Sequence, residues 1–331
     1  MTRLLMVELT RLRWRRAVLL LLAAAVVIPV VIGIGTVWDT RPPTAEDRAR
    51  VDAMVAEERE QPYVQEELQR CIEQPEEYGV DPQADPRAQC EEFIVPQPEW
   101  FADWRELNLV DEREQGSGLA VVVVVSLLLV LAGTTFVGHD WNSGSMSNQL
   151  LFQPRRARVW VAKGGVVLGV AFTLCLIVIT AYWLVLFAVA RSRDLPAGTG
   201  LLVDSLQMGL RGAVVAGLSA LGGFALTMLF RSTVATLGVL FAVTIAGGLL
   251  IAALGISERW YPQLNLMAVV TNGATYYEEL PDECFGTRPP EGVNCDGERE
   301  LSAAQGAAYL VPLLLAGGAA SLLSFRRRDV P

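Results

Sequence analysis

Residues 118–137 read GLAVVVVVSLLLVLAGTTFV, a run without a single charged side chain. An α-helix needs about 20 mainly apolar residues to cross the ~30 Å hydrocarbon core of a bilayer, because each residue adds about 1.5 Å. This run meets that length, and five other apolar runs have no charged side chain in their middles. The sequence therefore predicts an all-α polytopic membrane protein. The predicted spans are residues 17–38, 118–137, 164–190, 210–230, 234–256 and 303–325.

The distribution of residues supports this fold class more strongly than the totals do. The chain has 331 residues, of which 52% are hydrophobic, and its formal net charge is -9. Its mean hydropathy is +0.36. The acids crowd into residues 39–116 and 258–300, outside the apolar runs. Because nucleic acid requires a basic face, we expect no nucleic-acid partner.

Basic residues at the ends of the spans predict the orientation. They precede the first and third spans, separate the fourth from the fifth, and follow the sixth. Cytoplasmic segments carry an excess of Lys and Arg, so we expect a multi-pass protein of the cell membrane with both termini in the cytoplasm. The expected cytoplasmic segments are residues 1–16, 138–163, 231–233 and 326–331. The expected outer segments are residues 39–117, 191–209 and 257–302.

Four cysteines lie in the expected outer segments, where an oxidising environment permits disulfides. Four cysteines allow three connectivities. We predict pairing within each segment, Cys71 with Cys90 and Cys284 with Cys295, because each pair closes a short loop. Cys175 lies inside the third span and is expected to be a small buried apolar residue.

Two of the outer segments are expected to contain local structure. Thr44 and Asp47 resemble a capping box at the start of one helix, and a second helix is expected over residues 63–72. We expect this small helical insertion to cap an exit path, to bind an outer partner, or to be a solvated addition. In the last outer segment, residues 264–270 are apolar but too short to span, which indicates a re-entrant or interfacial segment.

The N-terminal segment is expected to form an amphipathic helix on the inner leaflet. One predicted face carries Leu5, Leu9 and Leu12, and the opposite face carries Arg3, Glu8, Arg11 and Arg15. The fourth span carries a stripe of small residues that permits close helix approach, either inside the chain or at a dimer face. These residues are Ala213, Ala216, Gly217, Ala220 and Gly223.

Residues 138–163 hold the most informative motif. A glycine is followed two residues later by an acid, then by a Gly-Ser pair, a proline with three arginines, and a lysine at the next span. The residues concerned are Gly138, Asp140, Trp141, Gly144, Ser145, Pro154, Arg155, Arg156, Arg158 and Lys163.

This pattern resembles the type-2 permease subunits of ATP-binding-cassette exporters. The resemblance extends to the N-terminal helix, the six spans, the last outer segment and the basic tail at residues 324–329. It does not cover residues 39–117, which are unusually long for that family. Asp140 stands where glutamate is commoner, and Ser145 where threonine is.

The resemblance implies that residues 138–163 form a coupling helix that docks into a cleft of a separate cassette ATPase. It also implies a second permease half, as a homodimer or a heterodimer. Asp140 and Trp141 would then supply a charge and a contact surface, and Gly144 a break in the helix. The implied coupling residues are Gly138, Asp140, Trp141, Gly144, Pro154, Arg156 and Arg158.

The sequence lacks the motifs of an enzyme. It has no Gly-x-x-x-x-Gly-Lys-Ser/Thr and no His-Glu-x-x-His, so we expect no cofactor and no metal on this chain, with ATP and Mg²⁺ bound by the partner. Its only histidine, His139, lies in an inner segment, which leaves Ser219 without a general base. The alternatives are an ion-coupled secondary transporter, which would need ionisable groups near the midplane, and a non-transporting membrane subunit.

Overall fold

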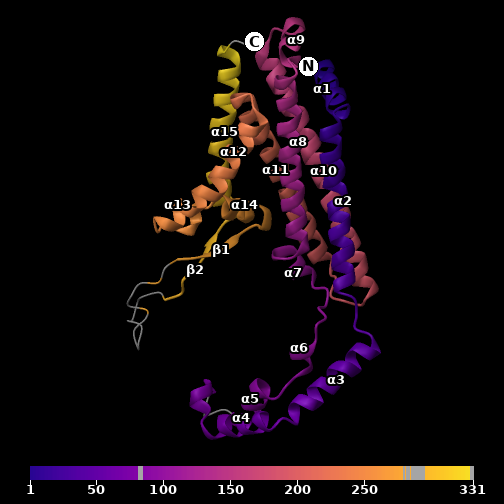
Figure 1. Cartoon of the computed structure of the whole chain (residues 1–331), viewed down its shortest axis with the longest axis vertical. Helices are drawn as coiled ribbons and strands as arrows, with labels where there is room; N and C mark the ends of the chain where they lie inside the picture. Colours follow the sequence, from indigo (N-terminus) through magenta and orange to yellow (C-terminus); the bar gives the residue numbers. More distant parts are fainter. Residues whose placement is uncertain (81–84, 279, 281–283, 285–294, 329–331) are drawn as a thin grey trace. The chain divides into compact units, whose positions relative to one another are not determined.

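The chain folds into two units (Figure 1). One comprises Met1–Ile34 with Asn108–Pro331, here called the helical unit, and the other comprises Gly35–Leu107, here called the acidic unit. The structure is a computed structural model that describes residues 1–80, 85–278, 280, 284 and 295–328. The last three residues of the expected tail lie outside the described residues.

Within the described residues, six helices are long and apolar enough to cross a membrane. This confirms a multi-pass helical architecture, and each helix coincides with one predicted span, although the fifth ends at Ala253, before the predicted end at residue 256. They are α2 (Arg16–Asp39), α8 (Ser117–Asn142) preceded by α7 (Leu109–Glu114), α10 (Arg156–Ser192), α11 (Thr199–Phe230), α12 to α13 (Thr233–Phe241 and Gly247–Ala253, joined by a π-helical turn at Ala242–Ala246), and α15 (Ala303–Arg327).

The core of the helical unit lies where α8, α10 and α11 pack together. A Cβ atom added at Gly217 would lie 3.2 Å from Phe172 of α10, and one at Gly223 would lie 3.0 Å from Thr134 of α8. The small residues of the fourth span therefore serve packing inside the chain. In contrast, α2, α12 to α13 and α15 bury few of their residues, as expected for helices that contact lipid.

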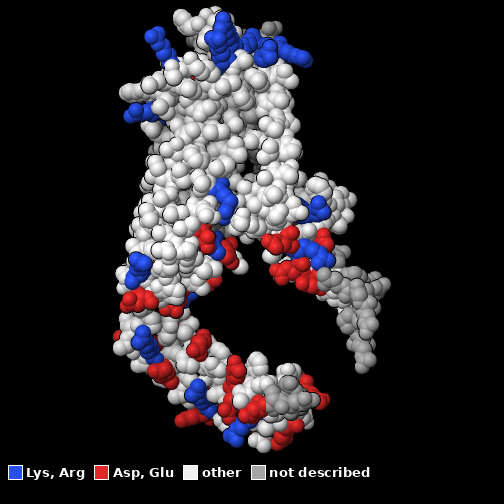
Figure 2. All heavy atoms as spheres, turned by 180° about the vertical axis from the view of Figure 1, so that it is seen from behind, with Lys and Arg blue, Asp and Glu red and all other residues white. Residues whose placement is uncertain are grey.

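The N-terminus and the described end of α15 lie at one end of the helical unit, here called the terminal end (Figure 1). This end also holds α1 (Thr2–Arg13) and α9 (Ser145–Phe152). Figure 2 shows Lys and Arg side chains gathered here, next to a band with few charged side chains. By the positive-inside rule, the terminal end is predicted to face the cytoplasm.

The opposite end of the helical unit contains α14 (Pro262–Thr271), which coincides with the predicted short apolar segment. Arg211 of α11 donates from Nε to the carbonyl oxygen of Val270 at 3.0 Å, near the end of α14. Two strands follow, β1 (Ala274–Tyr277) and β2 (Glu298–Leu301), paired antiparallel with Ala274 opposite Leu301. No pattern in the sequence predicted this ribbon, because four-residue strands are too short to establish a period of two.

The acidic unit contains short helices with well-defined starts. They are α3 (Ala45–Arg59), α4 (Pro62–Glu73), the 3₁₀ turn Pro75–Tyr78, α5 (Pro86–Ile94) and α6 (Pro98–Phe101). Thr44 and Asp47 form the predicted capping box at α3, and the Thr44 hydroxyl donates to the Asp47 carboxylate at 2.7 Å. This hydrogen bond lowers the pKa of Asp47, because it favours the charged carboxylate.

The cysteines pair as predicted. Cys71 and Cys90 lie at disulfide distance with their Cα atoms 5.9 Å apart, joining α4 to α5 in a cluster with Val80. Cys284 and Cys295 also pair, with a Cα separation of 5.6 Å. A cross-link of this kind is most useful in a unit with a small apolar core, as the acidic unit is. Cys175 is a buried free thiol, as expected.

Candidate functional site

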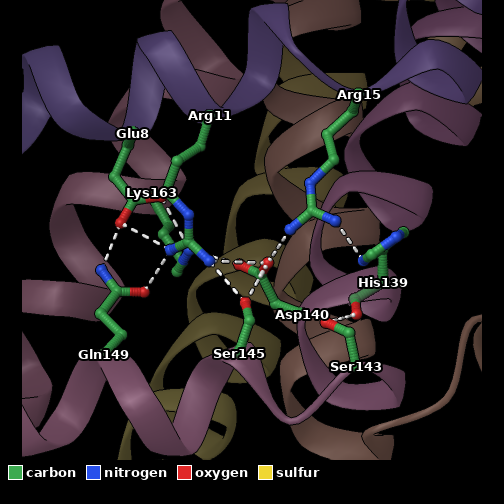
Figure 3. Close-up of polar contacts among 9 residues, drawn as sticks. All are labelled: Glu8, Arg11, Arg15, His139, Asp140, Ser143, Ser145, Gln149 and Lys163. Carbon is green, nitrogen blue, oxygen red and sulfur yellow. Dashed lines mark hydrogen bonds and ion pairs between the residues drawn. The ribbon is translucent and has the colours of Figure 1, made fainter.

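Nine polar residues from α1, α8, α9, α10 and their flanks meet at the terminal end (Figure 3). We call this group the Lys163 cluster. Three of its side chains, those of Glu8, Asp140 and Lys163, have no solvent exposure. Its members are Glu8, Arg11, Arg15, His139, Asp140, Ser143, Ser145, Gln149 and Lys163.

Lys163 lies at the centre and joins two carboxylates. Its Nζ donates to Glu8 Oε2 at 2.7 Å and to Asp140 Oδ2 at 2.5 Å. The ammonium also lies 5.2 Å from the centre of the Phe136 ring. Lys163 is the only lysine in the chain, although the chain has many arginines. A compact ammonium with three donors fits between two acids where a planar guanidinium would not.

The charge of Asp140 is also compensated by groups that contact its second carboxylate oxygen. Its Oδ1 accepts from Arg15 at 2.6 Å, from Ser145 at 2.9 Å and from Arg11 at 3.0 Å. Arg15 also contacts His139 through a nitrogen–nitrogen hydrogen bond. Removing one member of such a buried group costs much more than an exposed ion pair contributes, because it leaves a charge without compensation.

The cluster also fixes α9. Gln149 donates to Glu8 Oε1 and accepts from Arg11 at 2.6 Å. Arg11 donates to the Ser145 hydroxyl at 2.5 Å. The chain turns into α9 at Gly144, whose φ of 67° lies in the left-handed region that favours glycine. One set of charges therefore holds α1, α8, α9 and α10 together.

A second group of contacts lies on the other side of α8. The Trp141 ring meets Phe325 of α15 edge-on, with centroids 6.1 Å apart, and Arg231 lies 4.8 Å over the same ring. We call these three residues the Trp141 junction. Among the residues that the structure describes, Trp141 Nε1 and Arg231 Nη2 are buried without an acceptor. Buried donors in this state are uncommon and unfavourable.

The start of α10 holds the end of α15. Arg156 donates from Nη1 to the carbonyl oxygen of Phe325 at 3.2 Å and to that of Arg328. Trp160 donates from Nε1 to the Ser321 hydroxyl at 3.1 Å. Charged donors at a helix C-terminus satisfy carbonyls that have no partner within the helix. The sequence predicted Arg156 as a partner contact, whereas its hydrogen bonds are made within the chain.

Gly138 marks the close approach of α8 to α12. A Cβ atom placed there would lie 1.7 Å from Thr233 Oγ1, so the position has no space for a side chain. Gly138 is therefore needed for packing between two helices.

The structure corrects one expectation from the sequence and adds the contacts of α1. Asp140 was expected to present a charge to a partner, but its carboxylate is fully buried and paired with Lys163, Arg11 and Arg15. The sequence placed charged residues on one face of α1 but did not indicate what that face contacts. In the structure Glu8, Arg11 and Arg15 face the bundle and pair with Asp140 or Lys163.

Other predicted residues remain available at the surface. Gly144, Pro154 and Arg158 are exposed. Beside them, the sequence reasoning missed Leu151 and Phe152 at the end of α9, which are 79% and 90% exposed. Two adjacent large apolar residues in a short segment between spans were the signal for them.

The sequence analysis also did not predict that the residues of the Lys163 cluster meet. Glu8 is the only acid before Asp39, and Lys163 is the only lysine of the chain. Such isolated charges near apolar runs indicate a buried pairing, although their partners lie far apart in sequence. Comparison with known protein families, curated proteins and solved structures finds no match for this chain.

Proposed function

We propose that this chain is the permease subunit of an ATP-binding-cassette exporter, coupled through residues 138–163 to a separate ATPase. One observation carries the proposal. The short helix α9 presents Leu151 and Phe152 outward while the Lys163 cluster holds its other side to α1, α8 and α10. A docking element that transmits movement needs both an exposed contact and a stiff attachment to the spans.

The roles of the coupling residues follow from their positions. Phe152 and Leu151 supply the apolar contact, since exposed aromatic residues are frequent hot spots of interfaces. Asp140 and Lys163 position α9 rather than contact the partner. Pro154 and Arg158 are exposed and follow α9 in the chain, and in this proposal they form the rim of the contact. The motif of glycine, acid, Gly-Ser and proline-arginine between α8 and α10 adds support, because it resembles the type-2 permeases.

The assembly in this proposal contains two permease halves in the cell membrane, and ATP and Mg²⁺ belong to the ATPase. Both termini and α9 are then cytoplasmic, and the acidic unit is outside. Thiol labelling tests this topology. An impermeant reagent applied from outside should label Ser117→Cys and not Ser324→Cys, and the reverse pattern would refute it.

The test of coupling is Phe152→Ala in the chain co-expressed with a cassette ATPase encoded beside it. Because the Phe152 side chain is 90% exposed, its removal should leave the fold intact. Loss of an interfacial aromatic hot spot costs about 2 kcal/mol or more, so ATPase docking should weaken at least tenfold and transport should fall.

Trp100→Ala with Asp103→Ala in the acidic unit is the control. Trp100 is also exposed, at 53%, and this double variant should keep docking and transport. Full ATPase binding and full transport by Phe152→Ala would show that α9 is not the coupling element.

An ion-coupled transporter is a second candidate, because Glu8 and Asp140 are buried carboxylates. Such carboxylates serve as proton relays in ion-driven transport. Here, however, both are paired to cations, and Asp140 lies near the end of α8 rather than at its middle. Transport in proteoliposomes separates the two functions. Uptake that needs ATP favours the exporter, and uptake driven by an ion gradient without ATP favours the alternative.

A further inference from the structure

The outward face of α1 combines apolar and basic side chains. Met6, Val7 and Trp14 are 71%, 51% and 82% exposed. Arg3 and Arg13 are also exposed. They lie on the same face, because Arg3 is three residues before Met6 and four before Val7, and Arg13 is seven residues after Met6. Glu8, the only acid in α1, is buried on the other side.

The Lys163 cluster fixes the rotation of α1 about its axis. Glu8 bonds to α9 and α10, and Arg11, one helical turn later, bonds to α9 and α8. Arg15, a further turn along the chain, also bonds to α8. Turning the apolar side of α1 inward would break these buried ion pairs. The outward face of α1 is thus held outward, with large apolar groups and no neighbouring acid of its own helix.

We propose that this face of α1 binds anionic phospholipid of the leaflet at the terminal end. The guanidinium groups of Arg3 and Arg13 match phosphate groups, and their carbon stems cover apolar surface. The indole of Trp14 suits the depth of the headgroups. Basic residues beside an apolar face are the pattern by which helices bind anionic leaflets.

The position of α1 favours lipid over a soluble partner. The span α2 begins at Arg16, two residues after Trp14, and exposes Leu19 and Leu20 at 44% and 72%. The outward face of α1 is therefore continuous with a surface that a bilayer must cover. This inference depends on membrane insertion of α2 and does not require the proposed coupling to an ATPase.

The test measures which lipid surrounds α1. A fluorophore is attached to Thr10→Cys, on the same exposed face, in a Cys175→Ser background, and the full chain is placed in lipid nanodiscs. Quenching is compared for doxyl-labelled phosphatidylglycerol and doxyl-labelled phosphatidylcholine at equal mole fraction. We expect stronger quenching by the anionic lipid, with roughly fivefold local enrichment per arginine, falling at high salt.

Arg3→Gln with Arg13→Gln should abolish the preference for the anionic lipid, and these changes leave the Lys163 cluster intact. Arg326→Gln with Arg327→Gln, at the end of α15, is the matched control and should retain the preference. Equal quenching by both lipids, absence of quenching by either, or a preference that survives Arg3→Gln with Arg13→Gln would each overturn the proposal.

Discussion

The Lys163 cluster and the Trp141 junction lie on opposite sides of α8 and hold it in different ways. In the cluster, every carboxylate oxygen of Glu8 and Asp140 accepts from a described donor. In the junction, the two buried donors of Trp141 and Arg231 have no acceptor among the described residues. Each unsatisfied buried donor costs about 1–3 kcal/mol, whereas breaking the buried charge group costs about 3–5 kcal/mol.

This difference indicates which parts move together. α1, α8, α9 and α10 are expected to behave as one body, because separating them leaves charges uncompensated. The contacts of α8 with the α11–α12 turn and with α15 are less costly to rearrange. If a partner moves α9, we expect the relative motion to occur at the Trp141 junction.

The largest expected effect comes from the centre of the cluster. Lys163→Met removes the ammonium that joins Glu8 and Asp140, and we expect a loss of about 3–5 kcal/mol in the free energy of unfolding. The midpoint of SDS-induced unfolding in mixed micelles measures it. Arg155→Met, at an exposed position of the same loop, is the control and should have little effect. A shift no greater than that of the control would mean that the cluster does not hold the four helices.

An intermediate effect is expected at the side of α8 that faces α12. Gly138→Ala places a methyl group against Thr233, and overpacking of this kind costs about 1–3 kcal/mol. Thr233→Ala in the same chain should recover part of the loss. Gly169→Ala in α10, where no atom lies within 4 Å, should not destabilise. The same unfolding assay compares the three, and equal losses at the two glycines would contradict the close approach of α8 and α12.

The smallest expected effect comes from comparing an indole N–H group that has a hydrogen-bond acceptor with one that has none. Trp141→Phe keeps an aromatic ring against Phe325 and removes a donor without an acceptor, so stability should stay unchanged or rise by up to about 1 kcal/mol. Trp160→Phe makes the same change where Nε1 donates to Ser321, and should lose about 1 kcal/mol. Comparable destabilisation by both changes would show that the Trp141 donor is satisfied in the working protein.

The sequence determined the architecture of the chain, because this architecture depends on properties of residues that are close in sequence. A bilayer of fixed thickness selects runs of a fixed length, so the six spans could be read from apolar runs alone. The capping box at Thr44 and the two cysteine pairs were likewise predictable, because each involves residues close in sequence. The short apolar segment that became α14 was recognised for the same reason.

Only the tertiary structure decided what the charged residues do. Glu8, Asp140 and Lys163 come from three separate segments, and nothing local indicates which residues pair with which. Their pairing turns Glu8, Arg11 and Arg15 of α1 toward the bundle, because a buried charge without a partner is costly. The same pairing buries the carboxylate of Asp140, whereas Phe152 of α9 stays exposed.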